Sequence, residues 1–257
     1  MTSVLIAILA KDKAHCLPLY LRCLEQQTWP ASQTHIYIRT NNNNDDTLRV
    51  LAEWVERVHT RYATVFFDAS DVETRVQDLK PHEWTAERFQ VLGKIRQESI
   101  VTAQKLNAHY FVADCDNFIV PTTIADLVAT NLPVVGPLLK RGSGLLYSNY
   151  HHLADAQGYY AHSPHYETIW GGAVRGLIEV AVIHCTYLVR AEVLSAVAYL
   201  DDTTAHEYVI FSRQLRAAGI PQYIDNRKAY GEITFAETEA EFQAEPWYAG
   251  LVARTSE

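Results

Sequence analysis

The sequence predicts an α/β fold, in which a doubly wound and mostly parallel sheet carries helices on both of its faces. Apolar strand-like runs alternate with amphipathic helical segments as far as residue 113, in the order β-α-β-α-β-α-β. The first of these runs, Val4 to Ala10, is apolar throughout, which is typical of a parallel strand covered on both faces. In addition, 257 residues of which 48% are hydrophobic can bury a sizeable core within one domain.

The first half is expected to hold four strands and three helices. The strands cover residues 4–10, 35–39, 63–67 and 110–113. Pro18 marks the start of the first helix, because a first helical turn does not need the N–H that proline lacks. The second helix presents Leu51, Val55 and Val58 at helical spacing, and either Asp45 or Asp46 can cap it. After a loop at 69–84, the third helix is expected over about residues 85–106.

The second half is less regular. It is expected to contain a short helix (124–130), a short strand (134–135), loops or hairpins (140–175), a long strand (179–189), two helices (191–200 and 206–218) and a last short strand (223–224). Gly219 lies just beyond the last helix, where glycine commonly ends helices. Since no linker or repeat divides the chain, we expect a single domain over residues 1–257.

Charge and cysteine usage exclude several classes of function. The chain has 30 acidic and 22 basic side chains and a net charge of -8, which argues against nucleic-acid binding and against a polybasic membrane anchor. No apolar run is long enough for a membrane span, and the first run is a strand rather than a signal peptide because charges follow it at once. The four cysteines form no Cys-x-x-Cys pair, which predicts reduced thiols in a cytoplasmic protein rather than a zinc site.

The strongest candidate for chemistry is the pair Asp114 and Asp116, separated by Cys115 at the end of the strand over 110–113. Ligands of open α/β sheets bind at the carboxyl ends of strands. Two carboxylates this close repel each other unless a cation joins them, and their oxygen atoms suit Mg²⁺ or Mn²⁺. A turn in which one carboxylate caps a helix is the alternative.

Two other groups of polar residues lie beside predicted strands. The tract from Thr40 to Asp46 follows a strand and could contact a base or ribose, although a turn and helix cap explain it equally well. Lys94 and Arg96, on the long helix, could approach a diphosphate, whereas a solvated helix face is the plainer interpretation.

His184 and Glu207 are candidates of a different kind. Strict alternation places His184 on one strand face with Val182, Thr186 and Leu188, where a core histidine and a site residue are both consistent with the pattern. Glu207, at a helix start after His206, is either a dipole-stabilising residue or a general base.

Several further stretches accompany these candidates along almost the whole chain. They are Val4–Ala10 with Ala14-His15 and Leu17-Pro18, Thr40–Thr47 with Glu53-Trp54, Lys94–Gln97, Phe111–Phe118, Leu146–Asn149, Ile183–Thr186, Phe211–Arg213, Ala218–Ile220, Asn226-Arg227 and Tyr230-Gly231. In this order they resemble the glycosyltransferase domain of collagen β-galactosyltransferases and their bacterial and viral relatives, the family-25-like glycosyltransferases. The animal enzymes carry two such domains, and this chain is similar to one of them standing alone.

The resemblance implies a Rossmann-like GT-A fold, with a nucleotide-binding half over about residues 1–120 and an acceptor-side half over about 121–257. It also implies a UDP-sugar donor, with galactose or glucose as the sugar. Asp114 and Asp116 match the pair that holds Mn²⁺, or Mg²⁺, against the donor diphosphate. The metal would act there as a Lewis acid on the leaving UDP.

Further roles follow from the same resemblance. Thr40 and Asn41 match the loop that faces the nucleotide, and Lys94 matches a cation near the diphosphate. Asn149 and His184 match positions near the donor sugar, with the metal as the alternative partner of His184. Glu207 takes the position of the base that deprotonates a glycan or protein hydroxyl in an inverting transfer, at a helix start where the family often carries Asp-Asp and this chain has His206-Glu207.

Two other functions remain as alternatives. A sugar-nucleotide nucleotidyltransferase would also use a doubly wound sheet and a divalent ion, but it should carry a Gly-rich basic loop after the first strand. The segment over residues 11–15 contains no glycine, which disfavours that function. A non-catalytic module of the same fold would bind a nucleotide or sugar without turnover.

Overall fold

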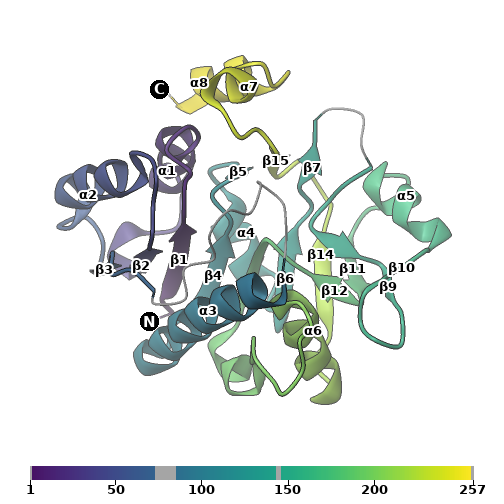
Figure 1. The fold of residues 1–257 in the computed structure, drawn as a ribbon. Coiled ribbons are helices and arrows are strands. Elements are labelled where there is room, and N and C mark those ends of the chain that lie inside the picture. Colours follow the sequence, from purple (N-terminus) through teal and green to yellow (C-terminus); the bar gives the residue numbers. More distant parts are fainter. Residues whose placement is uncertain (1, 73–84, 143–145, 256–257) are drawn as a thin grey trace.

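The computed structural model describes residues 2–72, 85–142 and 146–255, and at its centre lies an eight-stranded sheet (Figure 1). The order of its strands is β11 (Leu177–Val180), β14 (Gln222–Asp225), β6 (Val134–Pro137), β13 (Thr186–Val189), β4 (His109–Ala113), β1 (Val4–Ala10), β2 (Thr34–Thr40) and β3 (Thr64–Asp68). Strands β4, β1, β2 and β3 are mutually parallel, and β6 and β14 form a second parallel pair. β13 is antiparallel to both of its neighbours, and β11 is an antiparallel edge. The expected mostly parallel sheet is therefore confirmed.

Helices cover both faces of this sheet, as a doubly wound fold requires. On one face, α1 (Leu17–Glu25), α2 (Thr47–Val58) and α4 (Thr123–Ala129) share a core with Ile6 and Ile8 of β1. On the other face, α3 (Ala86–Leu106) and α6 (Glu207–Ala217) share a second core with Leu5 and Ala7, and both helices cross in front of the strands in Figure 1. Because β1 is buried from both sides, its apolar run shows no alternation.

A smaller sheet and two helices at the C-terminal end of the chain were not predicted from the sequence. The sheet contains β5 (Asn117–Ile119), β15 (Gly231–Ile233) and β7 (Lys140–Arg141). Gly231 approaches β5 so closely that a Cβ atom there would lie 1.9 Å from the Phe118 carbonyl oxygen. The helices α7 (Glu239–Gln243) and α8 (Tyr248–Thr255) follow, and Phe242 of α7 stacks on Phe118 with 5.2 Å between ring centroids.

The expectation of one long strand over 179–189 was wrong. The segment forms β11, then β12 (Val182–Ile183), and then β13 after a break at Cys185, which has a left-handed φ of +64°. β12 leaves the main sheet and pairs with β8 (Tyr150–His151). The alternation that placed His184 with Val182, Thr186 and Leu188 is therefore interrupted at His184.

Two other expectations in this half change. The helix expected over 191–200 is a shorter 3-10 helix, η2 (Ala191–Ala196), and a second such helix, η1 (Ala31–Gln33), precedes β2. The segment over 140–175 contains the expected hairpin, β9 (Leu153–Ala154) with β10 (Tyr160–Ala161), but also the helix α5 (Pro164–Trp170). Ser163 caps α5 by accepting from the His165 N–H, so the Ser-Pro pair was a helix-start signal that the sequence analysis missed.

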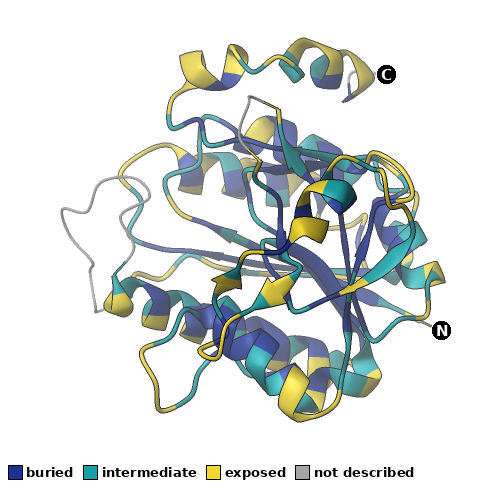
Figure 2. Ribbon diagram, turned by 90° about the vertical axis from the view of Figure 1, so that its right-hand side faces the viewer, coloured by how far each residue is buried: buried dark blue, intermediate teal, exposed yellow. Residues whose placement is uncertain are grey.

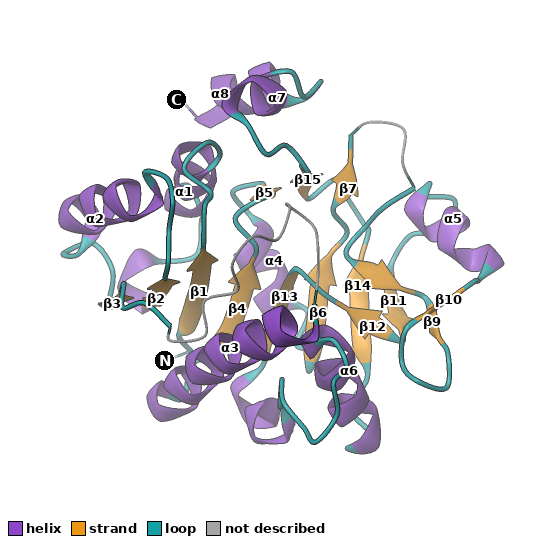
Figure 3. Cartoon of the chain, viewed as in Figure 1, coloured by secondary structure: helices purple, strands orange, loops and turns teal. Residues whose placement is uncertain are grey.

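The remaining features of the fold are one long loop and the exposure of one side of the molecule. Most of the loop at 69–84 lies outside the described residues. Within the described ranges, no helix combines the length and the apolar character that crossing a membrane requires. Figure 2 shows the side on which β9, β10 and α5 lie, where exposed residues are frequent. Figure 3 distinguishes the helices, strands and loops in the view of Figure 1.

Candidate active site

Asp114 and Asp116 occupy a tight turn directly after β4. The turn is closed by the Asn117 N–H, which donates to the Asp114 carbonyl at 2.9 Å. The Asp114 N–H donates to the Cys185 carbonyl, and the Thr234 N–H donates to the Asp116 carbonyl, both at 3.0 Å. The start of β13 and the end of β15 therefore fix the carboxylate pair from two sides, at the carboxyl edge of the central parallel strands.

Each of the two carboxylates contacts a cationic side chain of the protein. Nη2 of Arg96 donates to Oδ1 of Asp114 at 2.8 Å, and Nζ of Lys13 lies 3.3 Å from Oδ2 of Asp116. Burial raises the pKa of Asp116, an effect that Lys13 opposes and that neighbouring Asp114 reinforces. The repulsion between the two acids is thus offset by local positive charge, although the chain as a whole carries a net charge of -8.

Arg96 also connects this pair to the candidate base. Glu207 is the first residue of α6, and its Oε1 lies 3.5 Å from Nε of Arg96. The side chains of Arg96 and Glu207 are 5% and 6% exposed, so both charges are buried. Burial raises the pKa of Glu207 to about 7, with Arg96 opposing and Asp114 adding to the shift. A carboxylate with a pKa near neutrality suits general base catalysis.

Sequence reasoning considered Arg96 only as a companion of Lys94 and missed its bridging position. Helical periodicity would have indicated this position, because Arg96 is buried on the same helix face as Ser99, Ile100 and Ala103. Lys94 is exposed and borders a shallow depression on the outer side of α3 with Glu98 and other residues. The structure thus brings Arg96 to the acidic pair and leaves Lys94 on the solvent side, where contact with a diphosphate stays a prediction.

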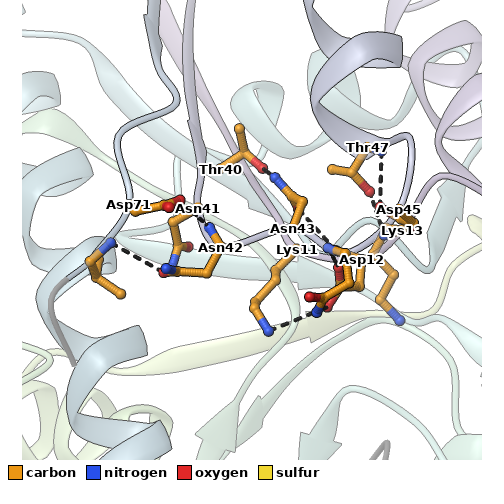
Figure 4. A network of polar contacts seen from close by, with 12 residues as sticks. Lys11, Asp12, Lys13, Thr40, Asn41, Asn42, Asn43, Asp45, Thr47 and Asp71 are labelled. Carbon is orange, nitrogen blue, oxygen red and sulfur yellow. Dashed lines mark hydrogen bonds and ion pairs between the residues drawn. The ribbon is translucent and has the colours of Figure 1, made fainter. Parts of the chain in front are cut away.

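The loop after β2 is held by its own polar side chains. Oγ1 of Thr40 accepts from Nδ2 of Asn43 at 2.7 Å, and Oδ1 of Asn43 accepts from the Asp12 N–H at 3.1 Å (Figure 4). Nδ2 of Asn41 donates to Oδ1 of Asn42 at 2.9 Å. Thr40 and Asn41 are both buried, so they form the floor of this loop.

Further bonds join this loop to the one after β1. The Lys13 N–H donates to Oγ1 of Thr47 at 2.7 Å, and the Ala14 N–H donates to Oδ2 of Asp45 at 2.9 Å. Oδ1 of Asp45 also accepts from the N–H of Thr47, the first residue of α2, at 2.9 Å. Asp46 is the N-cap residue of α2, and its side chain makes no capping hydrogen bond. Figure 4 shows how these side chains tie the two loops together. Lys13 contacts Asp116 from this locked segment, so the two loops together support the acidic turn.

Asn149 is engaged by the backbone around it. Its Nδ2 donates to the carbonyls of Pro137 at 2.9 Å and Thr186 at 3.1 Å, and its Oδ1 accepts from the Leu139 N–H at 3.0 Å. The Asn149 carbonyl in turn accepts from the His184 N–H at 3.1 Å. Asn149 therefore supports His184, and its contact with a donor sugar stays a prediction.

His184 is buried beside the acidic turn. Its Nδ1 lies 2.9 Å from Sγ of Cys185, and burial, reinforced by His151 and Arg96, lowers the pKa of His184 to about 3. The ring is therefore neutral at physiological pH. Among the residues that the structure describes, no group of three or more His, Cys, Asp or Glu side chains is placed to hold a metal, so Asp114 and Asp116 offer a pair of ligands rather than a closed site.

The comparison of this chain with known protein families agrees with the geometry of the site. The family model described as "Glycosyltransferase family 25, N-terminal domain" matches residues 1–244. The chain belongs to glycosyltransferase family 25. The family resemblance seen in the sequence is thereby confirmed.

Curated relatives of this family 25 chain include both active and inactive proteins by name. Human "Procollagen galactosyltransferase 2" is 33% identical over 242 residues, which cover 90% of this chain and 38% of the relative. Human "Inactive glycosyltransferase 25 family member 3" is 31% identical over 241 residues, which cover 90% of this chain and 40% of the relative. The family 25 chain therefore spans well under half the length of these relatives.

Solved structures support the fold. Residues 1–349 of S. aureus TarS match with a TM-score of 0.58 and 15% identity, covering 91% of this chain and 60% of the other. The same TarS fragment in complex with UDP-GlcNAc matches with a TM-score of 0.56 and 14% identity, covering 99% of this chain and 66% of the other. The expected GT-A fold of the family 25 chain is confirmed by these similarities.

Proposed function

We propose that this family 25 domain is an inverting, metal-dependent glycosyltransferase, which moves galactose or glucose from a UDP-sugar to a hydroxyl acceptor. The observation that carries the proposal is the chain of contacts from Asp114 through Arg96 to Glu207. It joins a strand-end acidic pair, suited to a donor diphosphate, to a buried carboxylate suited to remove a proton. Relatives named galactosyltransferases and a structural neighbour solved with UDP-GlcNAc support the donor class.

On the donor side, Asp114 and Asp116 would hold Mn²⁺ or Mg²⁺. Such ions are commonly bound by one or two carboxylates together with substrate phosphates, so a pair of ligands on one turn fits this arrangement. When bound, the ion would neutralise the charge that develops on the departing UDP. Lys13 and Arg96 hold the two carboxylates in place and offset part of their negative charge. Thr40 and Asn41 lie in the locked loop that we assign to the nucleotide.

On the acceptor side, Glu207 would receive the proton of the attacking hydroxyl. The hydroxyl oxygen bonds to the anomeric carbon while the bond from that carbon to the UDP oxygen breaks, and UDP leaves with the bonding electrons. Among the described residues, Oε2 of Glu207 has no hydrogen-bond partner, which leaves it able to accept this proton. The raised pKa of Glu207 makes it a competent base from about pH 7 upward.

A donor screen tests the proposal. We expect hydrolysis of UDP-galactose or UDP-glucose that depends on Mn²⁺. Asp114→Asn combined with Asp116→Asn should abolish metal-dependent UDP binding in calorimetry, whereas Glu207→Gln should keep UDP binding and lose sugar transfer. Unchanged UDP affinity and metal dependence in the double variant would refute the donor site, and near-normal turnover in Glu207→Gln would exclude Glu207 as the base.

A non-catalytic module is the second candidate, because a bovine relative named "Probable inactive glycosyltransferase 25 family member 3" is 32% identical to this chain. In that case UDP would bind without turnover, and Glu207→Gln would have no functional effect. The family match disfavours nucleotidyl transfer, which the glycine-free segment after β1 also disfavours.

We further propose a reducing, cytoplasmic setting. The four cysteines are free thiols, and burial raises the pKa of Cys16 and Cys23 to about 12. Thiols of this kind are unreactive packing residues rather than nucleophiles. Labelling of the native protein with a thiol reagent should therefore reach the partly exposed Cys185 ahead of Cys16 and Cys23.

A further inference from the structure

A cluster of ring side chains gathers around the start of α6. We call it the ring cluster, and it consists of His151, Tyr159, Tyr160, His184, His206 and Tyr208. His184 lies 5.3 Å from both His151 and Tyr208 between ring centroids, and His206 lies 5.0 Å from Tyr159 and 5.6 Å from Tyr208. These residues come from four segments that are separate in the sequence, so the fold, rather than a local motif, assembles them.

The ring cluster lies beside Glu207, the proposed base, and beside the turn that carries Asp114. Glu207 lies between two members in sequence, is buried, and keeps its Oε2 without a hydrogen-bond partner among the described residues. His184 is followed by Cys185, whose carbonyl accepts from the Asp114 N–H at 3.0 Å. A molecule held on the rings would therefore lie next to the base and close to the donor site.

The three histidines and Tyr208 of the ring cluster are uncharged at neutral pH. Burial lowers the pKa of His151 to about 4, and it also lowers the pKa of His206. Burial raises the pKa of Tyr208 to about 12. A neutral imidazole has one N–H donor and one nitrogen acceptor, and a tyrosine adds a hydroxyl to an apolar ring face. Such a surface suits a ligand with apolar C–H faces and hydroxyl edges better than an anion or a cation.

The cluster is open to solvent at one end. Tyr160, on β10, is 48% exposed and lies 5.5 Å from His151 between ring centroids. At the other end, His206 stacks on Phe89 at 3.7 Å with an interplanar angle of 17°, which fixes the orientation of the imidazole. The rings are thus preorganised inside and accessible outside, as an extended subsite requires.

We propose that the ring cluster binds a neutral sugar, so that the acceptor of this domain is a hydroxyl of a glycan rather than of a polypeptide. The inference rests on the proposed function, since it names the acceptor class of the same site. Extended peptides that add to a sheet edge gain affinity from main-chain hydrogen bonds. The ring cluster instead presents ring faces and neutral hydrogen-bonding groups from four segments, which is the chemistry that recognises a pyranose.

Binding of simple sugars tests the proposal without knowledge of the natural acceptor. We would titrate methyl β-D-galactopyranoside and methyl β-D-glucopyranoside and record saturation-transfer difference NMR, with and without UDP and Mn²⁺. We expect signals from the sugar C–H protons. Tyr160→Ala and His206→Ala should each raise the apparent Kd roughly ten-fold, the loss expected when one aromatic contact is removed.

Leu153→Ala is the matched control. Leu153 lies on β9, the partner strand of β10, and is 46% exposed, similar to Tyr160. This control should leave sugar binding unchanged, and calorimetric UDP affinity should stay unchanged in all three variants, which shows that each variant is folded.

Absence of any sugar signal, or equal Kd values in the ring and control variants, would overturn the proposal. Glycosylation of denatured collagen with no binding or glycosylation of either glycoside would also overturn it, because the acceptor would then be a polypeptide. Failure of the proposed function would give a different result. UDP would then not bind, while the glycoside titration without UDP would still show whether the ring cluster binds a sugar.

Discussion

The two sides of this molecule are built on different principles. On the proposed donor side, residues 2–72 and 85–116 include four parallel strands, and hydrogen bonds between side chains and backbone lock the loops after β1 and β2. On the proposed acceptor side, residues 146–235 form the helices α5 and α6 and strands of two to four residues, with a break at the left-handed Cys185, and the ring cluster draws its members from several of these short elements. The first side is suited to hold a donor in one fixed position, and the second presents its contacts from segments that are distant in the sequence.

The two sides meet at Arg96, and the largest expected effect follows from removing it. Arg96→Ala leaves the buried Glu207 and the partly exposed Asp114 without their shared cation. Loss of one partner of a buried ion pair costs about 3–5 kcal/mol, and we expect a loss of free energy of unfolding at the lower end of that range, because Glu207 can take up a proton. Urea denaturation measures it.

Lys94→Ala is the control for this variant, because Lys94 is exposed on the same helix only two residues away. Its free energy of unfolding should change by less than about 0.5 kcal/mol. Equal losses in the two variants would show that Arg96 does not bridge the sides. The UDP affinity of Lys94→Ala also decides the sequence-based prediction that Lys94 approaches the diphosphate.

The next effect concerns pH. Because the pKa of Glu207 is about 7 in the folded state and ordinary in the unfolded state, the folded protein holds this proton more tightly. Stability from this group is therefore full below the unfolded pKa and is lost as pH rises to about 7. Of this free energy, about 2.5 kcal/mol is lost between pH 5 and pH 8. The unfolding free energy of the wild type should fall between pH 5 and pH 8, and in Glu207→Gln the contribution of Glu207 to this fall should be missing.

Wild-type protein gives the reference for that measurement, because Asp116 and other groups titrate in both proteins. An identical pH dependence of stability in wild type and Glu207→Gln would contradict the raised pKa. Under the proposed mechanism, the same group predicts that the transfer rate falls below about pH 7, since a protonated Glu207 cannot accept a proton.

The sequence predicted the donor side far better than the acceptor side, and the reason is physical. Between residues 4 and 113, hydrophobic periodicity and caps such as Thr85 decide local structure, and these signals lie within a few residues of each other. Asp114 and Asp116 could be placed because they directly follow such a strand. Even here Arg96 was missed, since a buried charge on a helix becomes intelligible only when its distant partners are known.

On the acceptor side, the decisive contacts are between segments distant in the sequence. The strand expected through His184 breaks because β12 pairs with β8 rather than continuing in the main sheet. Glu207 could be proposed from family resemblance, but its burial and its contact with Arg96 depend on how α6 packs against α3. The ring cluster has no periodic signal, so only its His- and Tyr-rich composition could suggest it.

The break at Cys185 gives a third, smaller prediction. A left-handed backbone costs an L-residue about 1–2 kcal/mol, a cost that glycine avoids and a β-branched residue increases. Cys185→Val should therefore lower the free energy of unfolding by at least about 1 kcal/mol, whereas Cys185→Gly should be tolerated better despite its smaller side chain. Denaturation of the two variants in parallel checks this, and the reverse order would show that the strand does not need its break.

The smallest effect is expected on the donor side, where the loops are tied by many bonds. Asn43 joins the two loops by accepting from the Asp12 N–H and donating to Oγ1 of Thr40. Asn43→Ala should cost about 1 kcal/mol, the net value of a hydrogen bond or two at a half-buried site. It should also weaken UDP binding, since Lys13 reaches Asp116 from the segment that Asn43 holds.

Asp46→Ala is the control for this loop, because Asp46 is exposed and its carboxylate pairs with the exposed Arg49. It should change neither stability nor UDP affinity measurably. Weakened UDP binding in Asn43→Ala with unchanged transfer per bound donor would show that the locked loops serve the donor alone. A matching loss of acceptor binding would mean that rigidity on the donor side also sets the shape of the ring cluster, and that binding at the two sides is coupled.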